Sequence, residues 1–380
     1  MKQSFKCFLN ILLSGLYQKP FDEYCEDWDA LYESAKMHSV ENIFYQAIKD
    51  RLDVPDTLKE KVKKHYLGNI YQQISQDYYS EQIFNALNKK NIPYMPLKGY
   101  ALRKLYPNPE LRTSCDVDFF YDVSRTEELS EIMQSEGFVE EKGGRNHSVW
   151  RREMITFEPH FYLLSDNKKF HRYYQDVWEK LKCESGSLYS FTDEDFYIFF
   201  MVHSAKHFTH GGFGIRTVLD IHIYNQAKTL NREYLLCEFE KLGLVQFVET
   251  IEKISRCWFE GETMDEKLEC VSDYIIESGS YGVSLHRVMI NNVKENSVTK
   301  SKFVYLIRTL FLPYPQMKRR YPILQKCPVL LPFYWIRRWF AVIFKRRKNI
   351  KKTVQTMQLI TDKKVEKYSK ILEIIQVPLD

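Results

Sequence analysis

The amino-acid sequence predicts an α+β protein in which one small mixed β-sheet is flanked by N-terminal and C-terminal helical regions. Three observations support this class. Short segments with strand-like patterns gather between residues 91 and 185, where helical patterns separate several of them. Residues 1–90 and 186–300 follow the 3.6-residue period of helices instead. A chain of 380 residues also has room for two or three domains with a sizeable core.

We divide the chain into an N-terminal helical region (1–90), an α+β domain (91–185), a helical domain (186–300) and a basic, aromatic C-terminal segment with a final helix (301–380). The net charge of +5 is spread unevenly over these parts. Residues 301–352 contain 14 Lys and Arg and no Asp or Glu, so the basic character belongs to the last part. The eight scattered cysteines show no zinc-finger or C-x-x-C spacing, which predicts reduced thiols in a cytoplasmic protein.

The N-terminal region shows the periodicity of helices. Residues 1–16 predict an amphipathic helix, the pattern continues over 31–48, and Pro55 precedes a long helical pattern over 58–87. Aromatic residues at helical spacing usually lie in a core. We therefore expect the tyrosines of the long helix to be buried, namely Tyr66, Tyr71, Tyr78 and Tyr79.

The central domain opens with a strand, a glycine turn and a short helix. Residues 91–97 predict the strand, and the two prolines in it suit an edge strand or a strand start. Lys98-Gly99 breaks this pattern before the short helix begins. Glycine lets a backbone approach a ligand closely, and the amides that open a helix favour phosphate. The turn is therefore a candidate phosphate site.

The next strand, over 115–123, carries two aspartates. Asp116 and Asp118 are two residues apart, so both carboxylates project from one face while Val117 faces the other. Neighbouring carboxylates repel one another, and a divalent cation between them removes that repulsion. The alternative interpretation is a pair of solvated residues on an edge strand.

Strands and helices alternate after the two aspartates. The capping box Ser124-x-x-Glu127 is expected to open a helix that ends at Gly137. Strands follow at 138–140, 148–152 and 154–164. Thr192-x-x-Asp195 is expected to cap a helix over 196–208. Helices are predicted over 215–227 and 232–278, and a last helix over 364–375. Residues 279–299 are predicted to form a loop, with a strand as the alternative.

Several of these features occur in a particular order: Leu97-Lys98-Gly99, Tyr106-Pro107, Arg112, and then Asp116-Val117-Asp118-Phe119-Phe120. Together they resemble a bacterial family of uncharacterised nucleotidyltransferases with a polymerase-β-type fold. The resemblance implies that Asp116 and Asp118 bind catalytic metal ions, and that Lys98, Gly99 and Arg112 hold the nucleotide. This chain departs from the wider superfamily at the turn, where Lys-Gly stands in place of Gly-Ser or Gly-Gly. The role of Arg103 is left open.

The resemblance extends to Glu158 and His160. The family commonly shows Glu-x-His at this place, followed by an apolar or aromatic residue, and Phe161 fits. Glu158 is therefore expected to be the third carboxylate, which binds a metal or deprotonates the acceptor hydroxyl. The alternative for Glu158 is a surface glutamate without a role in catalysis. The alternative for His160 is a core histidine, and for this residue the functional and structural interpretations are balanced.

A histidine stretch recurs in the family and appears here as His203-Ser204-Ala205-Lys206-His207, followed by Arg216 and Asp220. His203, His207 and His210 invite a zinc interpretation, but the stretch lacks the glutamate of H-E-x-x-H and zinc is not favoured. Arg216 and Asp220 are four residues apart, which suits an ion pair on a helix surface. A role for them in shaping the nucleotide pocket is the alternative.

The sequence thus predicts a Mg²⁺- or Mn²⁺-dependent nucleotidyltransferase that moves a nucleoside monophosphate from an NTP to a hydroxyl and releases pyrophosphate. Relatives often accompany polysaccharide synthesis, so the resemblance implies a sugar, a lipid-linked glycan or a metabolite as acceptor, with protein as an alternative. Two rival interpretations stay open. One is a binding protein that kept the fold without the chemistry, and the other is a nucleic-acid-binding protein that uses the basic segment.

Residues 333–352 interleave aromatic residues with Lys and Arg, a pattern that suits a helix in an anionic membrane interface. The alternative is that Trp335, Trp339 and Phe340 pack on the core formed by residues before 300. No apolar run reaches the roughly 18 residues that a membrane-spanning helix requires. We therefore expect a cytoplasmic protein, with peripheral membrane contact as an open prediction. The oligomeric state is not predicted.

Overall fold

The computed structural model describes residues 3–23, 25–141, 143–144, 146–164, 167–280, 282–293, 307, 310–345 and 361–378. The chain divides into two compact units. The first comprises Met1–Phe208, Gly212–Gly282 and Ile374–Asp380, and the second comprises Thr209–Gly211 and Val283–Glu373. The predicted α+β class, with a small mixed sheet and helical flanks, is confirmed.

A seven-stranded sheet lies within the described part of the first unit, in the order β3-β4-β5-β2-β1-β7-β6. Strand β2 pairs antiparallel with β1 and parallel with β5, and β1 pairs parallel with β7. The strands are β1 (Tyr94–Pro96), β2 (Val117–Tyr121), β3 (Val139–Glu141), β4 (Val149–Arg152), β5 (Ile155–His160), β6 (Lys182–Ser185) and β7 (Leu188–Ser190). Sequence patterns predicted the first five but missed the hairpin of β6 and β7, which is short and has no buried face.

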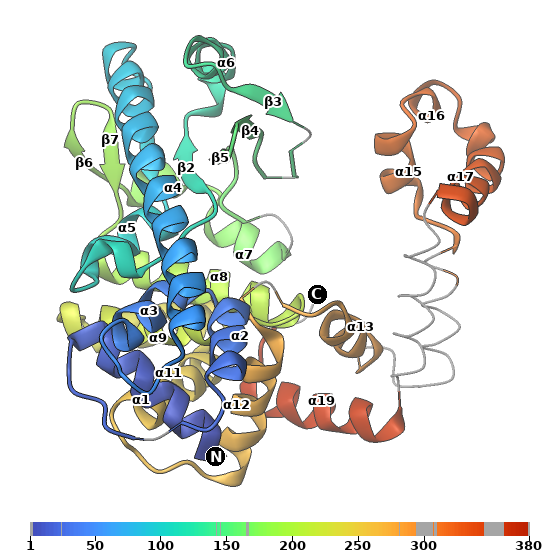
Figure 1. Cartoon of the computed structure of the whole chain (residues 1–380). Helices are drawn as coiled ribbons and strands as arrows, with labels where there is room; N and C mark the ends of the chain where they lie inside the picture. The colour runs from blue at the N-terminus through green and yellow to red at the C-terminus, as the bar shows by residue number, and fades with distance from the viewer. Residues whose placement is uncertain are drawn as a thin grey trace. The chain divides into compact units, whose positions relative to one another are not determined.

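One face of the sheet is covered by helices α4 (Asp56–Lys89) and α6 (Thr126–Ser135), as Figure 1 shows. Alternation along β2 sends Val117, Phe119 and Tyr121 into the core beneath these helices, where they meet Phe84 of α4 and Met133 of α6. The intervening residues of β2 face the other side of the sheet. Asp118 is therefore held on the face that α4 and α6 do not cover.

The tyrosines of α4 do not all lie in the core. Tyr71 and Tyr78 are 64% and 57% exposed, so the expectation that they are buried is wrong. Tyr66 and Tyr79 are partly buried, and Tyr79 packs edge-on against Phe138. Tyr71 and Tyr78 lie with the exposed Leu67 and Ile74 at helical spacing along this 34-residue helix. Its middle therefore exposes one side to solvent.

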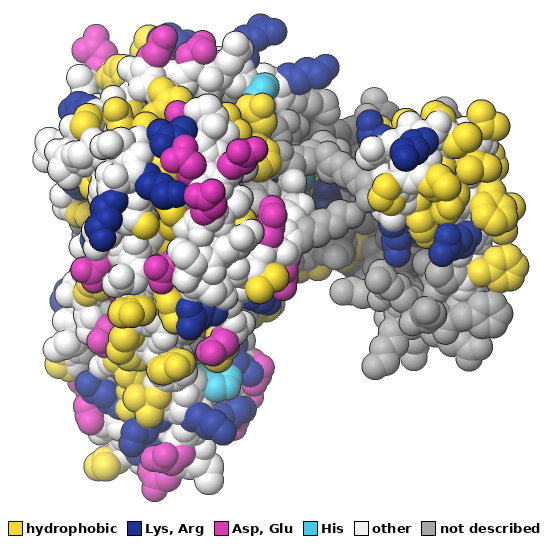
Figure 2. All heavy atoms as spheres, turned by 90° about the horizontal axis from the view of Figure 1, so that it is seen from above, with side chains coloured by type: hydrophobic (Ala, Val, Ile, Leu, Met, Phe, Trp, Pro, Cys, Tyr) yellow, Lys and Arg dark blue, Asp and Glu magenta, His cyan; other side chains and the backbone are white. Residues whose placement is uncertain are grey.

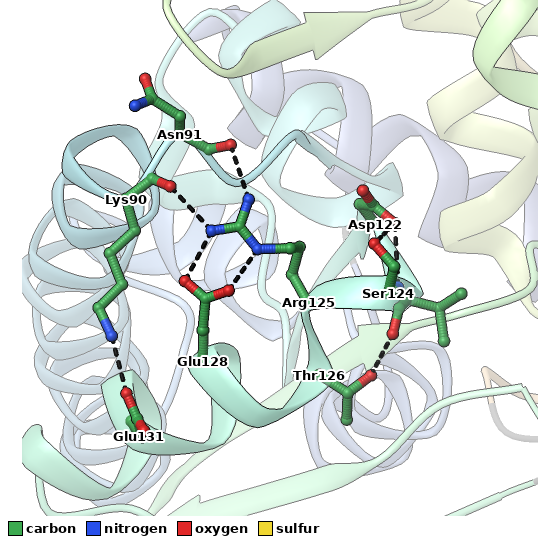
Figure 3. Close-up of polar contacts among 9 residues, drawn as sticks. Lys90, Asn91, Asp122, Ser124, Arg125, Thr126, Glu128 and Glu131 are labelled. Atoms are coloured by element: carbon green, nitrogen blue, oxygen red, sulfur yellow. Dashed lines mark hydrogen bonds and ion pairs between the residues drawn. The ribbon is translucent and has the colours of Figure 1, made fainter.

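The connection from β2 to α6 differs from the expected capping box. Asp122 accepts hydrogen bonds from the backbone N–H and the hydroxyl of Ser124, at 3.0 and 2.8 Å, and α6 begins two residues later (Figure 3). Arg125 donates to the carbonyl of Lys90 at 3.1 Å and to the Glu128 carboxylate at 2.6 Å. This network ties the start of α6 to the C-terminal end of α4.

Helices from both flanks pack together. Helix α1 (Gln3–Tyr17) contacts α3 (Glu41–Ile48) and α11 (Val245–Phe259), and α11 contacts α9 (Ile215–Ala227). The N-terminal and C-terminal helical regions thus share one helical layer. The remaining helices of this unit are α2 (Trp28–His38), α5 (Lys98–Leu102), α7 (Lys168–Tyr173), α8 (Asp193–Thr209, in the first unit as far as Phe208), α10 (Arg232–Leu242) and α12 (Glu266–Ser278).

Two sequence predictions about these helices are confirmed. The Thr192 hydroxyl accepts from the Asp195 N–H at 3.0 Å and donates to the Asp195 carboxylate at 2.8 Å, so Thr192 caps α8 as predicted, and the helix begins at Asp193. Helix α9 covers the predicted residues 215–227.

The second unit contains α13 (Ser284–Val293), α15 (Tyr314–Arg320), α16 (Ile323–Lys326), α17 (Leu331–Lys345) and most of α19 (Asp362–Ile375). The prediction of a loop over 279–299 is wrong for residues 284–293, which are helical, whereas the last helix is found as predicted. Residues 346–352 of the predicted membrane-contacting segment lie outside the described residues. None of the helices that the structure describes is long and apolar enough to pass through a membrane.

The aromatic residues of α17 make contacts inside the second unit. The indole N–H groups of Trp335 and Trp339 donate to the carbonyls of Leu312 and Leu310, at 2.9 and 2.6 Å. Phe340 is 59% exposed. The hydrogen bonds of Trp335 and Trp339 are thus with residues of the basic segment itself.

Candidate active site

The sheet topology brings three predicted segments together. The Leu97 N–H donates to the Asp118 carbonyl at 2.9 Å, so the turn after β1 lies beside the start of β2. On the other side of β2, Asp118 is paired with Glu158 and Phe120 with His160 on β5. Paired residues on neighbouring strands point to the same face. Asp118, Glu158 and His160 therefore share the face that α4 and α6 leave uncovered.

Asp118 is held between two cationic or hydrogen-bonding groups. The Lys98 ammonium nitrogen lies 3.7 Å from Asp118 Oδ2, and His160 Nε2 lies 2.8 Å from Asp118 Oδ1. The Asp118 side chain is only 11% exposed. Burial by itself raises the pKa of this carboxyl, but Lys98 and the hydrogen bond from His160 outweigh burial and lower the pKa well below its usual range. Asp118 is consequently an ionised carboxylate at neutral pH.

Asp116 lies immediately before β2, and the groups around it offset its negative charge less than Lys98 and His160 offset that of Asp118. Its carboxylate is 3.5 Å from the Ser114 hydroxyl, and within the described residues it forms no ion pair. Burial and the negative charge of Asp118 raise the pKa of Asp116, against the opposing effect of Lys98 and Arg216. The two aspartates of the D-x-D motif are therefore unequal, and Asp116 retains an unbalanced negative charge when it ionises.

Glu158 lies where the prediction of a third carboxylate requires it. It is beside Asp118 in the sheet, and its pKa is raised to about 7, first by burial and then by the charges of Asp118 and Asp116. Lys98 opposes this shift. The structure thus brings Asp116, Asp118, Glu158 and Lys98 into one electrostatic neighbourhood. Their catalytic and metal-binding roles remain predictions.

His147 belongs to the same neighbourhood and was missed by the sequence reasoning. It precedes β4 and pairs with His160 in an isolated bridge, and its Nε2 lies 3.4 Å from Glu158 Oε2. A Cβ at Gly144 would lie 2.7 Å from the His147 ring, so a residue larger than glycine would require the ring to move. Burial and the neighbouring His160 lower the pKa of His147 to about 4. No motif marks this loop, and only the β4–β5 pairing places it at the site.

The predicted phosphate turn has an unusual backbone. Lys98 has a φ angle of +29°, a left-handed conformation that is uncommon for residues other than glycine. It opens α5, which is five residues long. At Gly99, a Cβ would lie 2.9 Å from the Ser114 hydroxyl and 3.2 Å from an Arg112 nitrogen. Close packing of these side chains accounts for the glycine, and phosphate binding by its amide stays a prediction.

Arg112 is buried behind the site. It donates to both Asp220 oxygens, at 2.7 and 2.9 Å, and the Tyr106 hydroxyl donates to Asp220 at 2.6 Å. Burial lowers the pKa of Arg112, but the Asp220 charge outweighs it and the pKa is raised. The helix-surface ion pair considered for Arg216 and Asp220 is wrong, because Asp220 is buried and pairs with Arg112. The arrangement favours a positioning role for Arg112, and its contact with a nucleotide stays a prediction.

Arg216 and Arg103 differ in their position relative to the D-x-D motif. Arg216 donates to the Thr113 carbonyl at 3.1 Å, and its charge acts on Asp116. Arg103 is buried and forms an ion pair with Asp77 of α4. Arg216 is thus a further cation near the D-x-D motif, whereas Arg103 is engaged elsewhere.

His203 and His207 lie together on α8, with their Nε2 atoms 2.6 Å apart. Burial, followed by the charge of Lys98, lowers the pKa of His203. Within the described part of the chain, one set of three potential metal ligands converges, and it consists of His147, Glu158 and His160. The described residues therefore add no third ligand to the His203–His207 pair.

Comparisons with known proteins agree with this geometry at the level of the family. No curated protein and no solved structure matches the chain significantly. The model of a family described as "Uncharacterised nucleotidyltransferase" matches residues 24–260, which is more than half of the chain and includes the whole sheet. The chain belongs to this uncharacterised nucleotidyltransferase family.

Proposed function

We propose that this protein transfers a nucleoside monophosphate from an NTP to a hydroxyl group of an acceptor and releases pyrophosphate. Family membership supports nucleotidyl transfer in general. The observation that carries the proposal is the position of Asp116 and Asp118 at the start of β2, beside Lys98 and Glu158. Carboxylates next to a cation provide the charges that phosphoryl chemistry requires.

The donor set at Asp116 and Asp118 fits Mg²⁺ or Mn²⁺. Asp116 is a largely desolvated carboxylate that faces another carboxylate, and this arrangement is unfavourable until a cation joins it. Both side chains supply the oxygen ligands that these hard cations prefer. A bound cation would neutralise charge on the phosphate oxygens as the leaving group departs.

The chain's own residues would do the remaining work. Lys98 and Arg216 place positive charge near the D-x-D motif, where it favours binding and orientation of a triphosphate. Glu158, with a pKa of about 7, would accept the proton of the acceptor hydroxyl or bind a metal ion. A sugar, lipid-linked glycan, metabolite or protein hydroxyl is the proposed acceptor class.

A second function is favoured by one observation. Both oxygens of Asp118 already have partners, Lys98 and His160, and Lys98 stands where the superfamily usually has glycine. This arrangement suits a protein that binds a nucleotide without transferring it. The two proposals differ in whether the α–β phosphate bond of the nucleotide is broken.

The test uses the full chain, each NTP labelled on the α-phosphate, Mg²⁺ or Mn²⁺, and a cell extract as the source of acceptors. Transfer of label to a product by the wild type, and not by Asp116→Asn, supports the nucleotidyltransferase. Metal-dependent NTP binding by calorimetry without any labelled product supports the binding protein. Neither binding nor transfer with any of the four nucleotides contradicts both.

A further inference from the structure

Three side chains with different chemistry from the D-x-D motif converge next to it. One potential ligand atom from each of His147, Glu158 and His160 lies within 4.8 Å of the other two. Ligand atoms at 2.0–2.2 Å from a tetrahedral zinc ion are roughly 3.3 Å apart, and His147 Nε2 is already 3.4 Å from Glu158 Oε2. Small side-chain movements would therefore bring all three onto one ion.

His160 is prepared for metal binding by its contact with Asp118. Its Nε2 lies 2.8 Å from Asp118 Oδ1, whereas its Nδ1 is buried and has no hydrogen-bond partner among the residues that the structure describes. His160 itself is only 7% exposed. A neutral imidazole that donates Nε2–H to a carboxylate carries its lone pair on Nδ1. Histidine ligands of metals commonly donate their other nitrogen to a carboxylate in this way, which fixes the ring and raises its basicity.

His147 is fixed in place by the backbone around it. The Asn146 carbonyl accepts from the Phe161 N–H at 2.9 Å, and the Ser148 N–H donates to the Pro159 carbonyl at 3.1 Å. These bonds continue the ladder of β5 on both sides of His147 and present its ring to Glu158.

We propose that His147, Glu158 and His160 form a binding site for a transition-metal dication of the Zn²⁺ or Co²⁺ kind, with Asp118 as the carboxylate that orients His160. Two imidazoles and one carboxylate suit such an ion and leave a coordination position open for water or a substrate oxygen. Mg²⁺ prefers oxygen ligands and belongs at Asp116 and Asp118. The metal site goes beyond the proposed transfer reaction and does not depend on it.

The site gives Glu158 one definite role among those open to it. A carboxylate near Asp116 and Asp118 is unfavourable as an anion, and a dication bound by two neutral imidazoles would balance that charge. Asp118 then links the two sites, since it belongs to the D-x-D motif and one of its oxygens accepts a hydrogen bond from His160. The transition-metal site and the D-x-D motif are therefore adjacent but chemically distinct.

The experiment measures metal binding alone. The full chain is stripped with a chelator, dialysed and titrated with Co²⁺ in millimolar Mg²⁺, and the visible absorption of low-symmetry Co²⁺ is followed. Zn²⁺ affinity is obtained by competition. His147→Ala and Glu158→Gln are the test variants, because both side chains are 24% exposed and thermal unfolding can verify their folds. The controls are His207→Ala, which alters the neighbouring histidine pair, and His65→Ala on α4.

The expected result is one Co²⁺ per chain, displaced by Zn²⁺ and not by millimolar Mg²⁺. Each test variant should weaken binding at least tenfold, both controls should bind like the wild type, and Asp118→Asn should weaken binding about 10- to 100-fold. Three results would overturn the proposal: no stoichiometric Co²⁺ binding, equal affinity in the wild type and both test variants, or loss of binding in His207→Ala alone. Because no nucleotide is present, a failure of the transfer reaction cannot produce any of these results.

Discussion

The Arg112 guanidinium and the Asp220 carboxylate form a buried bidentate ion pair, with N···O distances of 2.7 and 2.9 Å. The pair joins the loop that precedes the D-x-D strand to helix α9, more than one hundred residues later in the chain. Arg216 of the same helix donates to the carbonyl of Thr113, beside Arg112. The position of Asp116 and Asp118 therefore depends on helix α9 as well as on the sheet.

Breaking this ion pair should destabilise the protein strongly. Arg112→Met or Asp220→Leu alone leaves one uncompensated buried charge, and we expect each to reduce the unfolding free energy by about 3–5 kcal/mol in urea titrations. The double variant Arg112→Met/Asp220→Leu removes both charges and should be less destabilised than either single variant. Losses that simply add in the double variant would show that the two side chains do not act as a pair.

His38 should make the fold sensitive to acid. Its ring is buried, its Nδ1 accepts from the Ile215 N–H at 3.2 Å, and burial lowers its pKa from 6.5 to about 4. The unfolded chain therefore binds this proton more readily, and stability falls as the pH drops from about 6.5 toward 4. The shift corresponds to a loss of about 3 kcal/mol when the drop is complete. His38→Asn should flatten the pH dependence of urea unfolding over this range, and the exposed His65→Asn should not; identical slopes in all three proteins would contradict the assignment.

Much of the site could be predicted from local pattern. The period-two pattern of the strand predicted that Asp118 lies on the face opposite Val117, and the structure agrees, whereas Asp116 lies just before the strand. The pairing of β2 with β5 could not be predicted, because it joins segments separated by α6 and the β3–β4 hairpin. That pairing places Glu158 beside Asp118, and it brings in His147, which no motif marks.

Other expectations failed where one local signal competed with another. The Asp122 carboxylate accepts a hydrogen bond from the Ser124 N–H, so a short turn forms before α6 in place of the expected capping box. Tyr71 and Tyr78 have the spacing of a core helix, but they lie on the exposed side of α4. In each case the outcome depended on neighbours that are distant in sequence.

Lys98 should contribute to nucleotide affinity. Its ammonium group is close to Asp118 and would meet the phosphates of an NTP bound at the D-x-D motif. We expect Lys98→Met to weaken NTP binding at least tenfold by calorimetry in the presence of Mg²⁺. Lys104→Met is the matched control, because Lys104 is exposed and its ammonium lies over the Tyr100 ring. Equal effects of the two substitutions would remove Lys98 from the nucleotide site.

The second unit should bind anionic membranes through α16, α17 and the turn between them. Figure 2 shows hydrophobic side chains gathered beside Lys and Arg on this part of the chain. The exposed apolar residues are Ile323, Val329, Leu330, Phe333, Ile336 and Phe340. Apolar residues beside cations, with no acidic residue between 301 and 352, are typical of a peripheral membrane surface.

Vesicle co-sedimentation checks this prediction. The full chain should sediment with vesicles that contain anionic lipid and much less with neutral vesicles, and salt should weaken the association. Phe333→Ser/Ile336→Ser should reduce binding several-fold. The matched control is Tyr71→Ser/Tyr78→Ser on α4, which removes exposed apolar area from the first unit. Equal sedimentation with neutral and anionic vesicles, or none with either, would contradict the prediction.

The central claim is that the start of β2 supports metal-dependent nucleotidyl transfer. The most direct measurement is incorporation of α-phosphate label into an acceptor by the wild type, Asp116→Asn and Asp118→Asn in the presence of Mg²⁺ or Mn²⁺. Asp116→Asn should fold at least as stably as the wild type, because it removes a carboxylate whose pKa is raised by burial and by Asp118. We predict that both variants lose transfer, whereas retention of more than about a tenth of the wild-type rate by either one, a barrier change of less than ~1.4 kcal/mol, would contradict the assignment.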